Sequence, residues 1–194
     1  MPTPSPTQDL PISQLPELTA ITANSEFAVA QGGTTYRVKK GNMSSGNIFI
    51  SAYHSTTQSG YTANTAYTIS ASTVAHSNGI TVVNGGEFHI SSGGTYNIQF
   101  SLQLDKKGGT SEDIDIWLAK NGTNVDWTNT NITLANNNNL VVAAWNFVEP
   151  LATGDYVELK VNVSNTNVII FAEDPQFSPT RPGTPSAIIT ITQI

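Results

Sequence analysis

Apolar and polar residues alternate with a period of two along most of the chain beyond residue 47. In the stretch TYNIQFSLQL, residues 95–104, every second residue from Tyr96 to Leu104 is apolar, and polar residues lie between them. This alternation is typical of a β-strand that turns one face to a hydrophobic core. No segment keeps a period of 3.6 residues over the length of a helix. The pattern therefore predicts an all-β protein.

Short clusters of Gly, Asn, Ser and Thr, such as NGG, SSGG, KNGT and ATGD, separate the strand-like segments and favour tight turns. Strands at this spacing are typical of an antiparallel sandwich or jelly roll. We predict ten strands, at residues 48–55, 65–72, 79–83, 87–90, 95–105, 113–120, 140–149, 155–164, 167–173 and 186–193.

Some of these segments are apolar on both sides. In DYVELKVNVS (155–164) the apolar residues take one side only, which predicts one face in water. In contrast, LVVAAWNFV (140–148) and SAIITITQI (186–194) are apolar on both sides, and Trp117 lies opposite the inward residues of its strand. A two-layer sandwich leaves one such face uncovered, and the simplest cover is another copy of the chain. We therefore expect self-association.

The N-terminal part has a different pattern. Residues 1–11 alternate Pro with polar residues, which favours an extended arm. EFAVAQ (26–31), the pair Gly32-Gly33 and TTYRVKK (34–40) predict a β-hairpin. A linker rich in Gly, Ser and Asn follows. We therefore expect an anchoring arm and hairpin over 1–47 and a head domain over 48–194.

Composition removes several classes of partner. The net charge is -6, with eight Lys and Arg spread thinly, which gives no field for a polyphosphate backbone and predicts no nucleic-acid binding. Cys is absent, so disulfide bonds and thiolate metal sites are excluded. No stretch reaches the ~20 apolar residues of a membrane span, and the N-terminal residues lack the pattern of a secretory signal.

The head resembles the jelly-roll domains of complement subcomponent q and the tumour necrosis factor superfamily. The landmarks that carry the resemblance occur in the family's order: GEF (86–88), GTYNIQF (94–100), LAKNG (118–122), LATGDYV (151–157) and the closing strand SAIITITQI (186–194). The resemblance implies a ten-strand jelly roll that forms a homotrimer. It also places the closing strand at the trimer axis. The chain departs from the animal family in having no collagen-like stalk.

Residues 12–42, ISQLPELTAITANSEFAVAQGGTTYRVKKGN, resemble the short leader of bacteriophage virion proteins such as fibres and other appendages. This second resemblance implies a protein made in the host cytoplasm and located on the virion. It predicts a capsid or tail protein as the partner of the leader. We assign the virion-anchoring contacts to Leu10, Ile12, Leu15, Leu18, Arg37, Lys39 and Lys40.

The chemistry-bearing residues form no recognisable catalytic pattern. The three histidines are far apart and no nucleophile motif accompanies them, so we predict no catalytic residue and no cofactor. Asp113 and Asp115 fall on one side of a strand, where oxygen ligands could hold a hard cation; a solvated strand end gives the same pattern, and we predict no metal. We assign trimer contacts to Trp117, Trp145, Phe147, Ile189 and Ile191.

These patterns together predict a phage virion structural protein that is not an enzyme. The first hypothesis is a homotrimeric capsid decoration, either a cement protein or a head fibre, docked on the particle by residues 1–47. The alternative is a short tail fibre or adhesin, whose head would bind a host glycan or receptor. Trp127, in the loop DWTNT, is the residue that we assign to a surface ligand.

Overall fold

The computed structural model describes residues 26–39, 47–135 and 140–194. The chain divides into two compact units, Met1–Ser45 and Gly46–Ile194. Within the described residues every regular element is a β-strand and every strand pairing is antiparallel, so the predicted all-β class is confirmed. None of these residues forms a helix long and apolar enough to cross a membrane. The predicted arm at 1–11 lies outside the described residues.

The first unit contains a hairpin of β1 (Glu26–Gln31) and β2 (Thr34–Lys39). Its loop consists of Gly32 and Gly33 alone, with φ angles of +60° and +78°. Glycine reaches these angles without steric cost, and a two-residue turn with positive φ matches the twist of the flanking strands. The predicted hairpin is confirmed.

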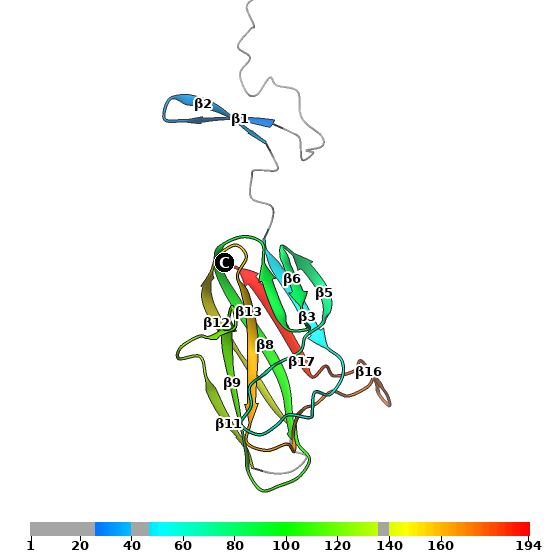
Figure 1. Ribbon diagram of the computed structural model, residues 1–194. Helices are drawn as coiled ribbons and strands as arrows, with labels where there is room; N and C mark the ends of the chain where they lie inside the picture. The colour runs from blue at the N-terminus through cyan, green and yellow to red at the C-terminus, as the bar shows by residue number, and fades with distance from the viewer. Residues whose placement is uncertain (1–25, 40–46, 136–139) are drawn as a thin grey trace, which may run out of the picture. The chain divides into compact units, whose positions relative to one another are not determined.

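The second unit is a sandwich of two sheets (Figure 1). Its strands are β3 (Phe49–His54), β4 (Tyr67–Thr68), β5 (Thr73–Asn78), β6 (Ile80–Val83), β7 (Glu87–Ile90), β8 (Gly94–Lys106), β9 (Glu112–Lys120), β10 (Thr123–Asn124), β11 (Thr130–Leu134), β12 (Val141–Leu151), β13 (Tyr156–Val163), β14 (Val168–Ile170), β15 (Gln176–Phe177), β16 (Thr180–Arg181) and β17 (Ala187–Gln193). The last short pair, β15 and β16, forms a hairpin apart from the two sheets.

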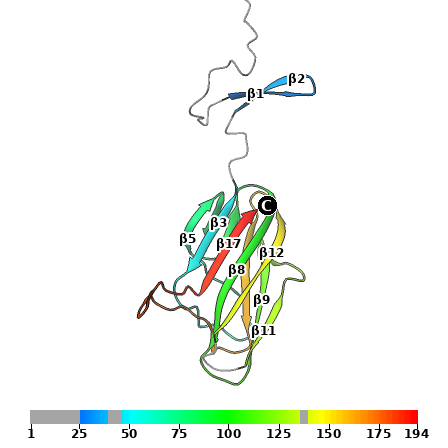
Figure 2. The same cartoon turned by 180° about the vertical axis from the view of Figure 1, so that it is seen from behind.

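The chain crosses repeatedly between the two sheets. The seven-stranded sheet has the order β10-β9-β13-β7-β6, with β11 also paired to β9 and β4 to β13. The six-stranded sheet has the order β12-β8-β17-β3-β5, with β14 also paired to β8; Figure 2 shows its five main strands side by side. From β7 to β13 the chain changes sheet four times, after β7, β8, β11 and β12, as in a jelly roll.

One hydrophobic core fills the space between the sheets. Along β8 the apolar positions from Tyr96 to Leu104 are 0–5% exposed, and along β13 those from Val157 to Val163 are 0–3% exposed. Burying each large side chain contributes about 1.5–3 kcal/mol. The inward faces predicted for these two strands are therefore confirmed.

The outward side of β13 is less exposed to solvent than its alternation predicts. Glu158 is only 5% exposed, because β4 pairs beside it and covers it. Its Oε1 accepts hydrogen bonds from Thr68 Oγ1 at 2.6 Å and from Lys160 Nζ at 2.7 Å. These bonds satisfy a carboxylate that would otherwise be costly to bury.

The predicted count of ten strands is not confirmed. Strand β5 was not predicted, because its sequence TVAHSN does not alternate and all six residues are exposed. Strand β11 was also missed, and of the segment 65–72 only β4 pairs as a strand. Strand β5 is stabilised by backbone hydrogen bonds to β3 rather than by burial of an apolar face, so hydrophobic periodicity does not indicate it. Strand β11 contributes only Ile132 and Leu134 to the core, which is too short a pattern to indicate a strand.

Two of the sequence landmarks, LAKNG (118–122) and LATGDYV (151–157), are in contact in the fold. Asp155 Oδ1 accepts a hydrogen bond from Asn121 Nδ2 at 2.8 Å, and its Oδ2 accepts from the backbone N–H of Ala152 at 2.8 Å and pairs with Lys120 Nζ at 3.1 Å. These contacts, that of Asn121 foremost, lower the pKa of Asp155 to about 2. The carboxylate thus joins the turn between β12 and β13 to the end of β9.

Gly86 lies where a side chain has no room. A Cβ atom at this position would lie 2.6 Å from the carbonyl oxygen of Ile69 and 2.6 Å from Thr68 Cγ2. The backbone there is held by the hydrogen bond from Ile69 N to Leu159 O at 2.8 Å. We expect Gly86→Ala to cost about 1–2 kcal/mol and to lower the thermal midpoint by about 2–8 °C, measured by circular dichroism.

Gly108→Ala is the matched control for this glycine. A Cβ at Gly108 would meet no atom closer than Asn167 Nδ2 at 3.6 Å, which is ordinary van der Waals contact. We expect its midpoint to stay at or slightly above that of the unaltered protein, because alanine reduces the entropy of the unfolded chain. Equal midpoints for the two variants would contradict this explanation of Gly86.

Candidate functional site

Fourteen outward positions on four strands of the six-stranded sheet carry no charged side chain; Asp105, near the end of β8, lies beyond them. Residues paired directly across a sheet point to the same side, and the inward set here includes the buried Ile98, Phe100 and Leu102. The outward set forms three rows, each of which crosses β12, β8, β17 and β3 in that order. The first row is Ala144, Ser101, Ile188 and Tyr53, the second is Asn146, Gln99, Thr190 and Ser51, and the third is Val148, Asn97, Thr192 and Phe49. Val142 of β12 and Gln103 of β8 form a shorter row beside the first. We call these fourteen residues the uncharged face.

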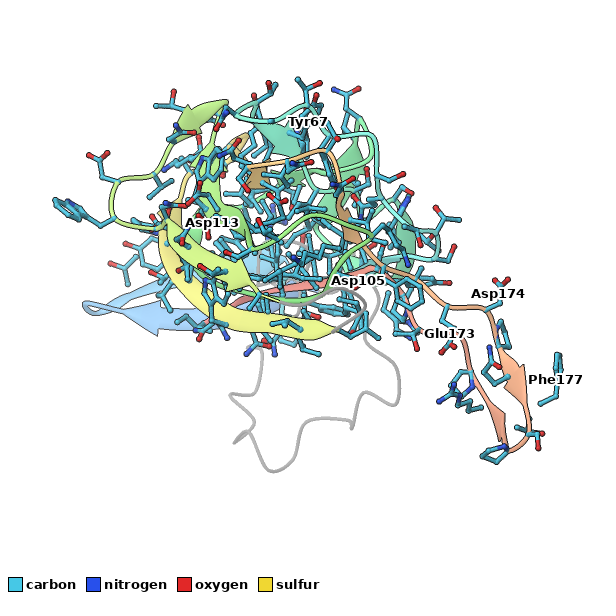
Figure 3. All side chains as sticks on the ribbon, turned by 90° about the horizontal axis from the view of Figure 1, so that it is seen from below. Tyr67, Asp105, Asp113, Glu173, Asp174 and Phe177 are labelled. Atoms are coloured by element: carbon cyan, nitrogen blue, oxygen red, sulfur yellow. The ribbon has the colours of Figure 1, made fainter. Side chains whose placement is uncertain are left out.

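A hollow of about 530 Å³ opens at one border of the uncharged face. Tyr53 and Ile188 of the face line it, together with Glu173 and Asp174. Figure 3 shows the latter two at the base of the β15–β16 hairpin, which extends from the sandwich and carries Phe177. Acidic groups therefore lie at the border of the uncharged face and not within it.

The residues predicted to make trimer contacts do not lie together on an outward surface. Four of them point into the core instead: Trp145, Phe147, Ile189 and Ile191. The two isoleucines are 2% and 0% exposed, and the Trp145 ring packs edge-on against Phe100 with centroids 4.5 Å apart. Strand pairing turns their smaller neighbours outward, so these four side chains belong to the core of one head, and their assignment to trimer contacts stays a prediction. The trimer itself stays a prediction.

Most of the predicted anchoring residues lie outside the part of the chain that the structure describes. Leu10, Ile12, Leu15, Leu18 and Lys40 lie outside the described residues. Lys39 is the last residue of β2, and the guanidinium of Arg37 pairs with Glu26 at 3.3 Å on the hairpin surface. An exposed pair of this kind contributes little to stability. The anchoring role stays a prediction.

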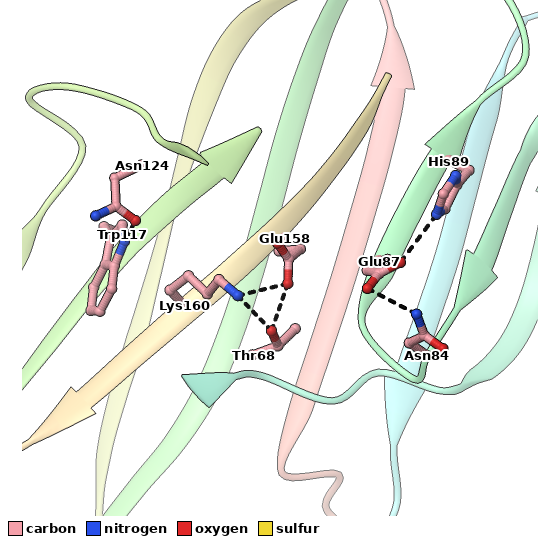
Figure 4. Close-up of polar contacts among 8 residues, drawn as sticks. All are labelled: Thr68, Asn84, Glu87, His89, Trp117, Asn124, Glu158 and Lys160. Carbon is pink, nitrogen blue, oxygen red and sulfur yellow. Dashed lines mark hydrogen bonds and ion pairs between the residues drawn. The ribbon is translucent and has the colours of Figure 1, made fainter. Parts of the chain in front are cut away.

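Trp117 and Trp127, which lie ten positions apart in the sequence, line one hollow of about 450 Å³ on the seven-stranded sheet. Trp117 is on the outward side of β9, as predicted, and its Nε1 donates a hydrogen bond to Asn124 Oδ1 at 2.7 Å (Figure 4). Trp127 is 102% exposed and has a φ angle of +63°. Trp117 and Trp127 therefore lie in the same hollow, whereas Trp145 packs against the core.

Asp115 lies in the same hollow and is held by three amides. Its Oδ1 accepts from Asn129 Nδ2 at 3.3 Å and from Asn131 Nδ2 at 3.0 Å, and its Oδ2 accepts from Asn162 Nδ2 at 3.0 Å. Burial would raise the pKa of Asp115, but the bonds from Asn131, Asn162 and Asn129 outweigh it and hold the pKa below its ordinary value. The group is a fixed carboxylate acceptor.

Asp113 lies beside Asp115 on the outward side of β9, as predicted, and its Oδ1 accepts from Thr133 Oγ1 at 2.7 Å. In the part of the chain that the structure describes, no three His, Asp or Glu side chains are grouped to hold a metal ion. Both carboxylates are instead engaged by side chains of the sheet.

His89 takes part in a cluster of surface contacts. His89 lies 3.3 Å from Glu87 Oε2 and stacks on the Tyr156 ring at 5.0 Å; Asn84 donates to the other oxygen of Glu87 at 3.0 Å (Figure 4). The hydrogen bond from Asn84 and then that from His89 lower the pKa of Glu87. This cluster links β7 to its preceding turn and to β13.

Comparison with known proteins identifies no family for the chain. No sequence model of a known family matches it, and no curated protein is similar to it. The crystal structure of murine APRIL at pH 8.5 is a solved structure to which the chain is similar, with a TM-score of 0.48 and 10% identity over 76% of this chain and 99% of that one. The resemblance to a phage leader stays a prediction.

The polar residues around the two tryptophans were missed by sequence reasoning. Asn124, Asn129 and Asn162 come from β10, a loop and β13, and the pairing of β9 with β10, β11 and β13 brings them together. The sequence did indicate part of this site, because Asp115 and Trp117 are two positions apart on one strand and therefore lie on the same side of it. Their partners depend on strand register, which a single sequence does not specify.

Proposed function

We propose that this chain is a non-enzymatic structural subunit of a bacteriophage virion, in which three copies of the head assemble through the uncharged face. The observation that carries the proposal is the complete absence of Asp, Glu, Lys and Arg from the fourteen residues of that face. The wider surface has acidic and basic residues on the other sheet, at positions such as Asp113 and Lys160.

An uncharged sheet face suits burial between copies for an energetic reason. Removing an ion from water costs several kcal/mol unless it is paired, whereas hydroxyl and amide side chains can bond across an interface. The face combines such groups, at Ser101 and Thr190 for example, with the exposed apolar Val142 (57%), Val148 (52%) and Ile188 (41%). Contact between copies would remove these apolar groups from water.

The number of copies and the location on a virion come from the two sequence resemblances. The landmarks of the head support three copies around an axis, with the face of β17 nearest to it. The leader over 12–42 supports attachment to a capsid or tail protein through residues 1–47, and the location on the virion follows from it. The chain then acts as a capsid decoration that displays the head.

Removal of residues 1–22 tests this division of roles. We expect the shortened chain to keep the mass of a trimer but to be absent from purified virus particles, because the contacts that anchor it are lost. Immunoblotting of particles from cells that make either form gives the readout. Gly108→Ala is the control, because it keeps residues 1–22 and should be present on particles like the unaltered chain. Truncated chain on particles at full amount would contradict the anchor, and absence of the full-length chain from particles would contradict the virion role.

The adhesin alternative is favoured by one observation, the fully exposed Trp127 on the opposite sheet from the uncharged face. A large aromatic side chain in water is the kind of group that binds a ligand. Particles that lack the protein distinguish the alternatives. Loss of resistance to heat or osmotic shock supports the decoration, whereas loss of adsorption to the host supports the adhesin.

A further inference from the structure

Trp127 is held in an exposed and strained position. A φ angle of +63° is uncommon for a bulky residue and is a source of backbone strain. The loop is held to β9 by Thr128, whose Oγ1 donates to Val125 O at 2.7 Å and accepts from Leu118 N at 3.1 Å. The Val125 N–H also donates to Leu118 O at 2.9 Å. The fold thus presents the Trp127 ring on a fixed loop, without covering it.

The second aromatic ring of the hollow is also oriented. The 2.7 Å hydrogen bond from Trp117 Nε1 to Asn124 Oδ1 restricts rotation of the indole, and β9 sets its position beside Asp115. Ring faces of this kind pack against the apolar C–H faces of a sugar ring, whose hydroxyls point sideways. A fixed aromatic ring loses little conformational entropy when a ligand binds.

Polar groups beside the rings match the hydroxyls of such a ligand. A carboxylate offers about four acceptor positions, and three of those of Asp115 are taken by Asn129, Asn131 and Asn162. The remaining position can accept a hydroxyl hydrogen. Asn64 and Asn124 also line the hollow with planar amides. A few fixed polar groups beside aromatic surface are the usual make-up of a small-molecule site.

The charges around the hollow select against acidic ligands. Asp115 and Asp126 line it, and none of the described residues in its lining is Lys or Arg. Lys160 pairs across from Trp117 in the sheet, but its Nζ is bound to Glu158 Oε1 at 2.7 Å and to Thr68 Oγ1 at 2.8 Å. A ligand carboxylate would therefore meet like charge without a partner cation.

We infer that the hollow lined by Trp117, Trp127 and Asp115 binds a neutral saccharide. Every group involved comes from one chain, on the seven-stranded sheet or its adjoining loops, so binding does not depend on the proposed trimer or virion location. If those proposals hold, the site gives three equivalent positions on one particle subunit, which would bind a repeated surface glycan with avidity.

The test is a titration of the full chain, followed by tryptophan fluorescence and calorimetry. The probes are neutral oligosaccharides of glucose, galactose, mannose and N-acetylglucosamine, and acidic oligosaccharides that carry N-acetylneuraminic acid or uronic acid. We expect at least one neutral probe to bind with a blue shift of the fluorescence, and acidic probes to bind at least tenfold more weakly. Trp127→Ala should weaken binding of the neutral probe at least tenfold.

Phe177→Ala is the matched control, because Phe177 is another exposed aromatic residue (86%) on a different hairpin, and it should bind as the unaltered chain does. Thr190→Lys, which alters only the uncharged face, should keep its binding per chain even as a monomer. Failure of all neutral probes to bind, preference for acidic probes, or unchanged affinity of Trp127→Ala would each overturn the inference. None of these results bears on self-association.

Discussion

Thr190→Lys is expected to convert the assembled protein into monomers, with the measured mass falling from about 62 kDa, three copies of 20.6 kDa, to 20.6 kDa. Thr190 is in the central row of the uncharged face, between Gln99 on β8 and Ser51 on β3. A lysine there would bring several ammonium groups into an interface that offers no carboxylate within the face. Desolvation of an unpaired ion costs several kcal/mol, and each copy contributes one.

The substitution should leave the fold of each chain intact, because Thr190 points outward and its strand is held by Ile189 and Ile191 in the core. Thr81→Lys is the matched control: it is the same change at an exposed position in the middle of β6, on the other sheet. Its mass should stay that of the unaltered protein. If both variants remain assembled, the uncharged face is not the interface.

Asp155→Asn is expected to lower the free energy of unfolding by on the order of 2–3 kcal/mol at neutral pH, and the thermal midpoint by about 5–10 °C. The amide that replaces the carboxylate would turn an N–H group toward donors on Lys120, Asn121 and Ala152. Asp174→Asn is the control, since the exposed Asp174 side chain makes no such contact in the described residues and should have little effect.

The effect of Asp155 should depend on pH in a defined direction. Its pKa in the folded chain is lowered from 3.8 to about 2, so the carboxylate stabilises the fold at pH values above about 4. This contribution is lost as the pH falls through about 2, where the folded chain also binds the proton. The difference in midpoint between the unaltered chain and Asp155→Asn should therefore shrink between pH 4 and pH 2. A difference that stays constant over this range would show that charge is not the cause.

Hydrophobic alternation predicted the parts of the fold in which burial decides the structure. The inward sides of β8 and β13 follow directly from their sequences, because every second residue is apolar from Tyr96 to Leu104 and from Val157 to Val163. Strand β5 forms for a different reason: it pairs with the edge of β3, and its exposed residues follow no period. Pairing with a distant strand does not leave a pattern in the local sequence.

The candidate surfaces were harder to predict than the strands. In β12 and β17 both sides are apolar, so the larger side chains Trp145 and Ile189 could have belonged to either face. Only the pairing of both with Phe100 shows that they point inward. Likewise Trp117 was assigned to an interface because of its strand, whereas the loop that brings Trp127 beside it depends on the hydrogen bonds of Thr128.

The most direct test of the central claim, that copies of the head associate through the uncharged face, is the mass of the full-length chain in solution. Sedimentation equilibrium over a range of micromolar concentrations gives that mass without assumptions about shape. We expect a single species of about 62 kDa. A stable species of 20.6 kDa at all concentrations would contradict the account.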